Sequence, residues 1–504
     1  MLASAYTFTL LGVEARPVRV EVDVHAGLGS FSIVGLPDTA IRESRERVRA
    51  ALGNSGFKFP QQRITANLAP ADLRKGGPGL DLAIAAALLG ASDQLPVTKL
   101  EGLAFVGELA LNGAIRSVPG VLAMAEAARQ AGARALAVPV ANGAEAALAG
   151  GARIVPISHL RQLELIGTDD EPPAPTPLPF ARNGASAELP DLAELRGQPA
   201  LRRALEIAAA GGHNLLLVGP PGAGKSMAAR RMPSILPPLS DPEAIEVLRI
   251  ASACGSIEAR PDPRLRPFRA PHHTISTAGL VGGGVPPRPG EVTLAHRGVL
   301  FLDELGEFPR DALEALRQPL EDGRVTIVRA RHAVALPCRF MLVAATNPCP
   351  CGKGPESPEC ECTLGAVNRY QARVSGAVAD RIDAIVAVER PSSEEMGGGP
   401  GERSAAVRQR VVAARERQEH RLGRGRCNAD ASGGEIRAVG GIDSAARELL
   451  AAGYERLGLS GRGYDRALRL ARTIADLDGS DRVRPDHVGE ALSLRRRRAS
   501  PVPA

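Results

Sequence analysis

The chain has 504 residues, which corresponds to roughly three domains at about 150 residues each. Its 44% hydrophobic and 23% charged residues are ordinary globular values, so collagen and wholesale disorder are excluded, while 55 Gly and 41 Pro indicate several long loops. The net charge of +6 suits a polyanionic partner, but a sequence with no Trp, four Tyr and ten Phe argues against a nucleic-acid surface built on base stacking. Any DNA contact should therefore run from Arg, Lys and backbone amides to phosphates, with little sequence specificity.

Neither a membrane anchor nor a disulfide framework is expected. No apolar run reaches the roughly 18 residues of a membrane span, and the N-terminal segment MLASAYTFTL lacks the basic and long apolar parts of a signal peptide. Seven cysteines are too few for a disulfide framework in a chain of this length. We predict a cytoplasmic protein with no membrane partner.

Residues 1–167 predict an N-terminal α/β or α+β domain. Helical Ala/Leu-rich patterns at Asp81 to Leu89 and Val121 to Gln130 are mixed here with short β-rich runs. The β-rich runs are VRVEVDV, FSIVG, RITANLAP and LAFVGELAL. The stretch 168–190 that follows is rich in Pro, Ala and acidic residues and has no apolar periodicity, which is typical of a semi-extended linker.

Residues 191–391 predict a doubly wound core with a parallel sheet, because strand patterns alternate with helical ones. The strands are expected at Leu215–Val218, Val299–Leu302 and Phe340–Ala345, and the helices at Leu201–Ala210 and Asp311–Leu320. A Gly-rich break at 392–403 indicates a second linker. Residues 404–504 predict a small, Arg-rich helical domain with helices at about Ala445–Leu457, Tyr464–Leu477 and Pro485–Arg496.

A phosphate-binding P-loop follows the first core strand and precedes a helix. It consists of Gly219, Pro220, Pro221, Gly222, Ala223, Gly224, Lys225 and Ser226. The glycines let backbone N–H groups curl around phosphates, Lys225 reaches the β and γ phosphates, and Ser226 ligates Mg²⁺. A Gly-rich turn with a surface lysine is the alternative, but it does not explain the strand, loop and helix together. We predict ATP and Mg²⁺ as cofactors.

Polar side chains at the ends of the next two core strands complete this predicted site. Asp303 should hold Mg²⁺ through water, and Glu304 should orient and deprotonate the attacking water. Asn347 can hydrogen-bond both the γ-phosphate and that water, although an Asn before a Pro is more often a turn former. Gly197 and Gln198, upstream of the helix that leads into the P-loop strand, are candidate neighbours of the adenine.

Residues 324–337 predict a β-hairpin with a basic tip, because Val and Ile alternate on both sides of a charged segment. Arg329, Arg331 and His332 in that segment are candidate contacts to DNA phosphates. A solvated hairpin tip is the alternative, since charged tips are common.

Four cysteines crowd into one loop after Asn347. They are Cys349, Cys351, Cys360 and Cys362. Four thiolates on a short loop suit tetrahedral zinc in a structural site, and free cysteines in a reducing cytosol are the alternative. The adjacent His272 and His273 have no carboxylate at helical spacing, so we interpret them as structural or DNA-proximal residues rather than metal ligands.

Further segments combine with these motifs along essentially the whole chain. They are APHHTIS at Ala270–Ser276, LVGGG at Leu280–Gly284, PRPGE at Pro287–Glu291, DRID at Asp380–Asp383 and ARTIADL at Ala471–Leu477. Together with the P-loop they resemble the ComM/YifB family of magnesium-chelatase-like AAA+ ATPases. The resemblance implies an AAA+ ATPase core at 191–391 and a C-terminal helical lid at 404–504.

This resemblance also implies roles for two arginines. Arg381 would be an arginine finger that completes the ATP site of a neighbouring subunit, and Arg462 would be the lid arginine called sensor 2. Arg466 and Arg469 lie on the same predicted helix, and Arg466 stays an alternative to Arg462. A finger used in trans requires a ring, here a homo-hexamer. The basic hairpin and the Gly/Pro-rich loop at about 272–291 would correspond to insertions that project toward the pore.

Residues 1–167 resemble the C-terminal domain of Lon proteases, which is ribosomal S5 domain 2-like, through GELALNG at Gly107–Gly113 and VPG at Val118–Gly120. Gly79 and Leu122 stand near the positions where the protease pattern needs its nucleophile and its lysine. Peptide hydrolysis by that mechanism is therefore not expected. The domain should instead bind DNA, shape the ring or recruit partners.

The function that the resemblance implies is that of an ATP-dependent DNA motor. Such a helicase or branch-migration translocase would act on single-stranded, forked or branched DNA during homologous recombination and natural transformation, with recombination proteins as partners. The alternative is a chelatase-like or chaperone-like ATPase that remodels a protein substrate. An ATP-dependent protease is disfavoured by Gly79 and Leu122.

Overall fold

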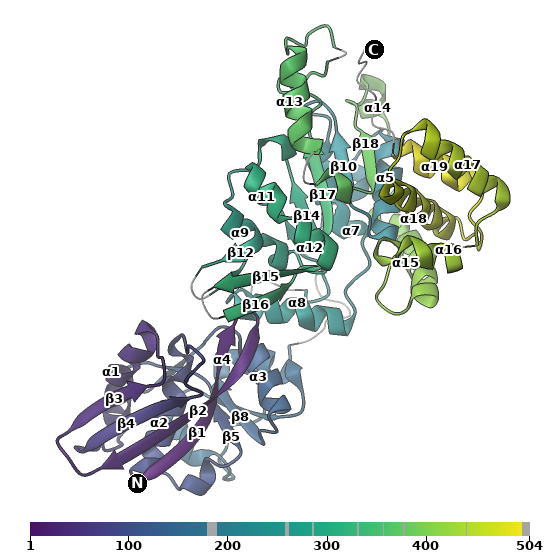
Figure 1. Ribbon diagram of the computed structural model, residues 1–504. Coiled ribbons are helices and arrows are strands. Elements are labelled where there is room, and N and C mark those ends of the chain that lie inside the picture. The colour runs from purple at the N-terminus through teal and green to yellow at the C-terminus, as the bar shows by residue number, and fades with distance from the viewer. Residues whose placement is uncertain are drawn as a thin grey trace.

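The computed structural model describes residues 1–178, 189–257, 262–284, 287–329, 332–355, 357–375, 378–439 and 441–495. Figure 1 shows a sheet with its helices at the N-terminal end of the molecule, a second sheet in the middle, and the C-terminal helices packed beside that second sheet. Across these ranges, no helix combines the length and the apolarity that a bilayer crossing requires.

The N-terminal sheet is mixed. Its seven strands, counted in the described residues, run in the order β3-β4-β2-β1-β5-β8-β9. The strands are β1 Leu2–Leu11, β2 Glu14–His25, β3 Ser30–Val34, β4 Arg63–Ala69, β5 Leu103–Phe105, β8 Ala135–Pro139 and β9 Arg153–Ile157. The helices are α1 Thr39–Asn54, α2 Asp81–Ala91, α3 Val121–Gln130 and α4 Val140–Ala146, and a small hairpin joins β6 Glu108–Leu109 to β7 Ile115–Arg116. The β1–β2 and β2–β4 pairs are antiparallel, and the other pairs are parallel.

Two apolar clusters cover the two faces of this sheet. Helices α1 and α2 contribute to one cluster and α3 and α4 to the other, and every residue of α2 is buried. Alternate residues of β2, including Val18, Val20 and Val22, point into the α1–α2 cluster. The sequence patterns do not predict β1, because its Ser, Thr and Ala residues lack a clear apolar alternation.

The middle of the molecule contains the parallel sheet that the sequence predicts. Its strands are β10 Leu215–Val218, β11 Phe268–Arg269, β14 Val299–Leu302, β17 Met341–Thr346 and β18 Ala384–Ala387, in the order β11-β14-β17-β10-β18 within the described residues. All neighbouring pairs are parallel. The carboxyl ends of β10, β14 and β17 therefore lie side by side at one edge of the sheet, which is where doubly wound sheets bind ligands.

Alternation along the core strands explains how both faces of this sheet are buried. Leu215 and Leu217 of β10 point into the cluster that α5 and the C-terminal helices share, whereas Leu216 points into the cluster on the opposite face. In β14, Phe301 likewise points into the first of these clusters, and its neighbour Leu300 points into the second. Short apolar runs without polar interruption are what a sheet covered on both faces requires.

Short helices and hairpins surround this sheet. The helices are α5 Pro199–Gly211, α6 Lys225–Arg230, α7 Met232–Ile235, α8 Asp241–Ala253, α9 Thr277–Val281, α10 Glu291–Leu294, α11 Arg310–Ala315, α12 Arg317–Asp322, α13 Leu364–Ser375 and α14 Ser393–Gly397. The hairpins pair β12 Gly282–Gly283 with β13 Arg288–Pro289 and β15 Arg324–Arg329 with β16 His332–Pro337. The helix predicted at 311–320 is split into α11 and α12 at Leu316, and Pro319 lies in the second piece. The predicted second linker contains α14 and contacts the core, since the Gly401 N–H donates to the Ala193 carbonyl at 2.8 Å.

The C-terminal helices continue the core of the parallel sheet. They are α15 Ser404–Leu422, α16 Gly433–Val439, α17 Ser444–Arg456, α18 Gly461–Leu477 and α19 Pro485–Ser493. Residues of α15, α18 and α19 share one apolar cluster with α5 and the strands (Figure 1). Buried Arg472 of α18 pairs with Asp476 at 3.0 Å, and Arg421 of α15 donates to the same carboxylate at 2.7 Å. The pair between Arg421 and Asp476 fixes α18 against α15.

The β15–β16 hairpin lies against the N-terminal sheet. Val13, in the turn between β1 and β2, belongs to the same apolar cluster as Val325 and Leu336 of the hairpin. At Gly12, which has φ +69°, a Cβ would lie 2.5 Å from a Val334 methyl group. A glycine is needed there both for the backbone conformation and for this close approach.

Candidate active site

The P-loop connects β10 to α6. Gly222 and Gly224 have φ values of +78° and +88°, a region that L side chains rarely adopt, so both glycines are required by the loop's curvature. At Gly219 the reason is space, because a Cβ would lie 2.1 Å from the Val388 carbonyl oxygen. The loop is therefore shaped to turn its backbone toward a phosphate group.

Lys225 begins α6 and its ammonium group lies inside the loop. Its Nζ donates to the Pro220 carbonyl at 2.9 Å and to Oδ1 of Asn347 at 3.0 Å. Burial lowers the pKa of Lys225, while the carboxylates of Asp303 and Glu304 act in the opposite direction. The structure thus brings Asn347, from the tip of β17, to the P-loop lysine.

Ser226 and Asp303 lie in direct contact. The Ser226 hydroxyl donates to Oδ2 of Asp303 at 2.5 Å, and the Glu304 backbone N–H donates to Oδ1 at 3.0 Å. A hydroxyl and a carboxylate at one point form the hard oxygen donor set that Mg²⁺ prefers, so these residues fit the ion. Lys225 and the P-loop glycines fit the phosphates of ATP.

Glu304 is held by His273, which no sequence motif connects with it. Nδ1 of His273 lies 3.2 Å from Oε2 of Glu304, and the His273 ring also packs against Phe308. Glu304 itself adopts φ +53°, a left-handed conformation that is uncommon for residues other than glycine. The adjacent His272 bonds Thr274 instead. Only the fold reveals this contact, because His273 lies 31 residues before Glu304 in the chain.

Gln198 lies behind the P-loop. Its Nε2 donates to the carbonyls of Ala223 at 2.9 Å and Glu389 at 2.7 Å, while its buried Oε1 has no hydrogen-bond partner. A buried hydrogen-bond acceptor without a partner lowers the stability of the folded state. An exocyclic amino group of a nucleotide base would satisfy it, which is consistent with the expected position beside adenine.

The two predicted arginines lie elsewhere. Arg381 contacts Glu321 of α12, and Arg462 of α18 lies 3.9 Å from the same carboxylate. The Arg381 carbonyl accepts from the Asn214 side chain, which immediately precedes β10, whereas the P-loop follows the far end of β10. Arg381 and Arg462 are therefore close to each other but remote from the P-loop of their own chain. Arg466 instead pairs with buried Asp383 at 3.5 Å.

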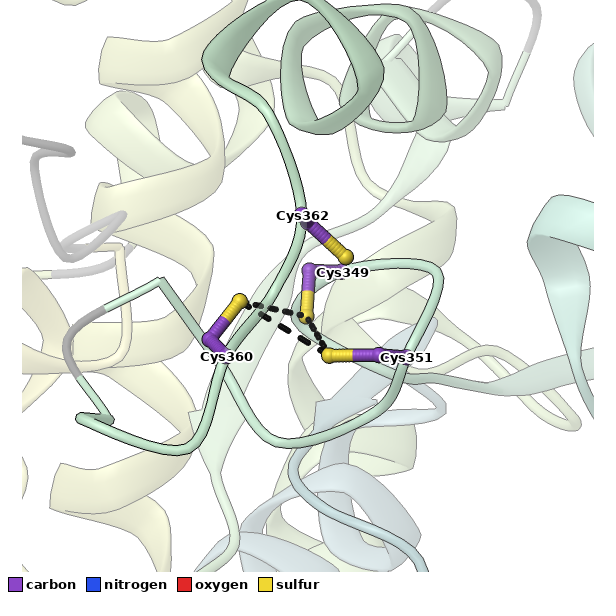
Figure 2. Close-up of side chains that lie close together, drawn as sticks. All are labelled: Cys349, Cys351, Cys360 and Cys362. Atoms are coloured by element: carbon purple, nitrogen blue, oxygen red, sulfur yellow. Dashed lines mark hydrogen bonds between the residues drawn. The ribbon is translucent and has the colours of Figure 1, made fainter.

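The four clustered cysteines meet in the loop between β17 and α13, as Figure 2 shows. Cys349 Sγ lies 3.4 Å from the sulfur of Cys351 and 3.8 Å from that of Cys360, and the Cys351 and Cys360 sulfurs are 3.7 Å apart. With Cys362 included, all four sulfurs lie within 4.8 Å of one another. This separation suits a single metal ion.

The candidate DNA contacts lie at the tip of the β15–β16 hairpin. Arg329 and His332 are register partners at the ends of the two strands, but their side chains lie outside the described part of the structure. Arg331 lies outside the described residues altogether. Gly79 and Leu122, at the positions relevant to a protease, are buried.

Sequence comparison identifies the family. Residues 191–396 match the model of magnesium chelatase, subunit ChlI, residues 20–142 match that of subunit ChlI of Mg-chelatase, and residues 401–495 match that of the ChlI C-terminal part. The uncharacterized protein YifB of Escherichia coli K12 is 45% identical over 500 residues, which cover 98% of this chain and 97% of the relative. Competence protein ComM of Haemophilus influenzae is 42% identical over 506 residues, with the same two shares. The chain belongs to the ComM/YifB family of magnesium-chelatase-like AAA+ proteins.

Membership of this family implies ATPase activity with ATP and Mg²⁺. A further match, to Lon protease 2 of Bacillus subtilis, is 29% identical over 141 residues and covers 25% of this chain.

Proposed function

We propose that the chain is an ATP hydrolase that assembles into a homo-hexamer and drives DNA helicase or branch-migration activity in homologous recombination and natural transformation. The observation that carries the proposal is the convergence of Lys225, Ser226, Asp303 and Asn347 at the carboxyl edge of the parallel sheet, with Glu304 beside them. The competence role rests on the name of the Haemophilus relative.

Each residue has a distinct task in hydrolysis. Lys225 and the P-loop amides hold the phosphates, Asn347 orients the γ-phosphate and the attacking water, and Glu304 accepts a proton from that water. Mg²⁺, when bound at Ser226 and Asp303, neutralises charge on the phosphate oxygens. His273 keeps the Glu304 carboxylate in position for proton transfer.

The positions of Arg381 and Arg462 support a ring. Four residues of β10, about 13 Å of strand at 3.3 Å each, separate the P-loop from the edge where Arg381 lies. Arg381 therefore serves the ATP site of a neighbouring subunit, with Glu321 as its partner within its own chain. Arg462, beside the same Glu321, acts at the same junction between subunits.

The proposed DNA contacts are at the tip of the β15–β16 hairpin, through Arg329, Arg331 and His332. Arginines that bind phosphates without reading bases suit a motor that must move over any sequence. The hairpin's other contact, with the β1–β2 turn, supports a role for the N-terminal domain in positioning it.

Steady-state ATP hydrolysis tests this proposal. The rate should be measured at physiological salt without DNA, with single-stranded DNA and with a four-way junction, using Glu304→Gln as the inactive control. Strong stimulation, greatest with the junction, is expected for a DNA motor. A rate that is indifferent to every DNA while the control is inactive would instead favour an ATPase that remodels a protein substrate.

A further inference from the structure

The four-cysteine cluster has the dimensions of a mononuclear metal centre. Zinc binds thiolates at about 2.3 Å, so the sulfurs of a zinc tetrahedron lie about 3.8 Å apart. Three sulfur–sulfur distances in the loop, from 3.4 to 3.8 Å, are close to that edge length. Each of the seven cysteines, all in described parts of the chain, carries a free thiol. The cluster is thus built from thiols that have not paired as disulfides.

A single metal ion fits the four cysteines better than an iron–sulfur cluster does. All four sulfurs lie within 4.8 Å of one another, so each reaches a single central ion, whereas an iron–sulfur cluster distributes its thiolates over several metal atoms. The Gly354 backbone N–H donates to the Cys349 sulfur at 3.2 Å, the kind of outer contact that orients a metal ligand. Cys349 is buried and the sulfurs of the other three cysteines converge on it (Figure 2).

The same loop lies against the nucleotide site. A Cβ at Gly352 would lie 2.8 Å from the Pro221 ring of the P-loop and 3.9 Å from Cγ of Asn347. Asn347, whose side chain accepts from Lys225, is only two residues before Cys349. The position of the loop therefore affects both the P-loop and the polar residue at the tip of β17.

We propose that Cys349, Cys351, Cys360 and Cys362 bind one zinc ion as thiolates, and that this ion holds Gly352 against Pro221 and Asn347 against Lys225. Binding releases the four thiol protons to solvent, and all four tetrahedral positions are filled by sulfur, which makes the centre structural. The part of the proposal in which the ion positions Gly352 and Asn347, here called the holding role, rests on the proposed ATPase function. The metal site itself does not.

Metal content tests the site directly. Full-length protein purified without chelator should contain about one zinc per chain by elemental analysis, and Cys360→Ser/Cys362→Ser should contain almost none. Cys254→Ser removes a cysteine far from the cluster and should retain the full content. Replacement of zinc by cobalt should give the visible spectrum of a four-coordinate thiolate site. Wild-type protein with much less than one zinc per chain, with iron in its place, or with equal zinc in the double variant would overturn the proposal.

If the double variant does not fold, the wild-type protein supplies the same test. Titration with a mercurial thiol reagent, with a colorimetric zinc indicator present, should release one zinc as the cluster is modified. Modification of the cysteines without zinc release would contradict the site.

A pair of glycine variants tests the holding role while leaving the cysteines in place. Gly352 and Gly354 both have positive φ, but a Cβ at Gly354 would meet only Pro348, at 3.4 Å. Gly352→Ala should retain zinc and lower ATP turnover about tenfold more than Gly354→Ala. Equal turnover in the two variants would overturn the holding role. If wild-type protein bound zinc but hydrolysed no ATP, the proposed function would fail while the metal site stood.

Discussion

At the scale of single residues, the site depends on contacts between segments that are far apart in the sequence. Lys225 lies in the P-loop, Asn347 follows β17, and Oδ1 of Asn347 accepts from the lysine ammonium at 3.0 Å. His273 precedes α9 and lies 3.2 Å from Glu304. In the proposed mechanism the lysine and its asparagine locate the phosphates, and His273 orients the Glu304 carboxylate that accepts the proton.

The contact between His273 and Glu304 gives a prediction about turnover. His273→Ala should lower kcat by up to about 100-fold, because a small displacement of a general base has a large effect, and should leave nucleotide affinity nearly unchanged. The measurement is single-turnover hydrolysis together with the Kd of a nucleotide analogue. His272→Ala is the matched control, since His272 bonds Thr274 rather than Glu304. Equal losses in the two variants would show that His273 has no special role.

Much of this site could be predicted because its signals are local. The P-loop, Asp303 and Glu304 follow strands whose apolar runs are uninterrupted, and β10 and β14 have the bounds expected from the sequence. The contacts of His273 with Glu304 and of Arg381 with Glu321 could not be predicted. Both join segments separated by tens of residues, and no periodicity in either segment encodes its partner.

At the scale of elements, a small ionic cluster ties α8 to the segment after α10. Oε2 of Glu246 lies 3.1 Å from Nε2 of His296 and 2.9 Å from Nε of Arg297. Nδ1 of His296 accepts from the Arg339 backbone N–H, so the proton of the neutral ring lies on Nε2 and points at Glu246. The cluster thus joins three segments on one side of the parallel sheet.

This cluster should make stability sensitive to acid. The hydrogen bond from His296, and then that from Arg297, lower the pKa of Glu246 to about 2 from its ordinary 4.5, and burial lowers the pKa of His296 from 6.5. Both groups therefore stabilise the fold at neutral pH. The contribution of His296 is lost as the pH falls below about 6.5, and that of Glu246 is lost as the pH falls from about 4.5 toward 2. Glu246→Gln should lower Tm at neutral pH and flatten its fall between about pH 4.5 and pH 2. Parallel curves of Tm against pH for the wild-type protein and the Glu246→Gln variant would contradict this prediction.

The β15–β16 hairpin gives a prediction about DNA binding. Arg329→Ala/Arg331→Ala should weaken binding to all DNA sequences about equally and reduce the slope of log affinity against log salt by about one per arginine. Fluorescence anisotropy across a salt series measures both quantities. Arg324→Ala, at the base of the same hairpin, is the control. An unchanged slope in the double variant would remove the tip from the DNA interface.

At the scale of the whole molecule, the proposed catalytic residues lie at one edge of the parallel sheet, and the two arginines proposed to act between subunits lie at the other. If Arg381 is the proposed arginine finger, a single chain has an incomplete site, because Arg381 contacts Glu321 rather than its own P-loop. The proposed closed ring of identical subunits would complete every site at once, with one arrangement repeated around the axis. The N-terminal sheet lies on the side of the β15–β16 hairpin (Figure 1), and Val13 of its β1–β2 turn shares an apolar cluster with the hairpin.

Mixing two inactive variants tests the ring. Lys225→Ala and Arg381→Ala should each be inactive alone, since an arginine at the γ-phosphate contributes about 10³ to 10⁵ in rate. In an equimolar mixture, up to about a quarter of the interfaces pair an intact P-loop with an intact Arg381, so part of the ATPase rate should return. A mixture as inactive as its components would indicate that Arg381 does not act across a subunit boundary.

The most direct measurement of the central claim is the conversion of a labelled four-way DNA junction into its separated arms in the presence of ATP and Mg²⁺. Wild-type protein should separate the arms at a rate that follows ATP hydrolysis, and Glu304→Gln should bind the junction but leave it intact. Rapid ATP hydrolysis by wild-type protein with the junction unchanged would contradict the account.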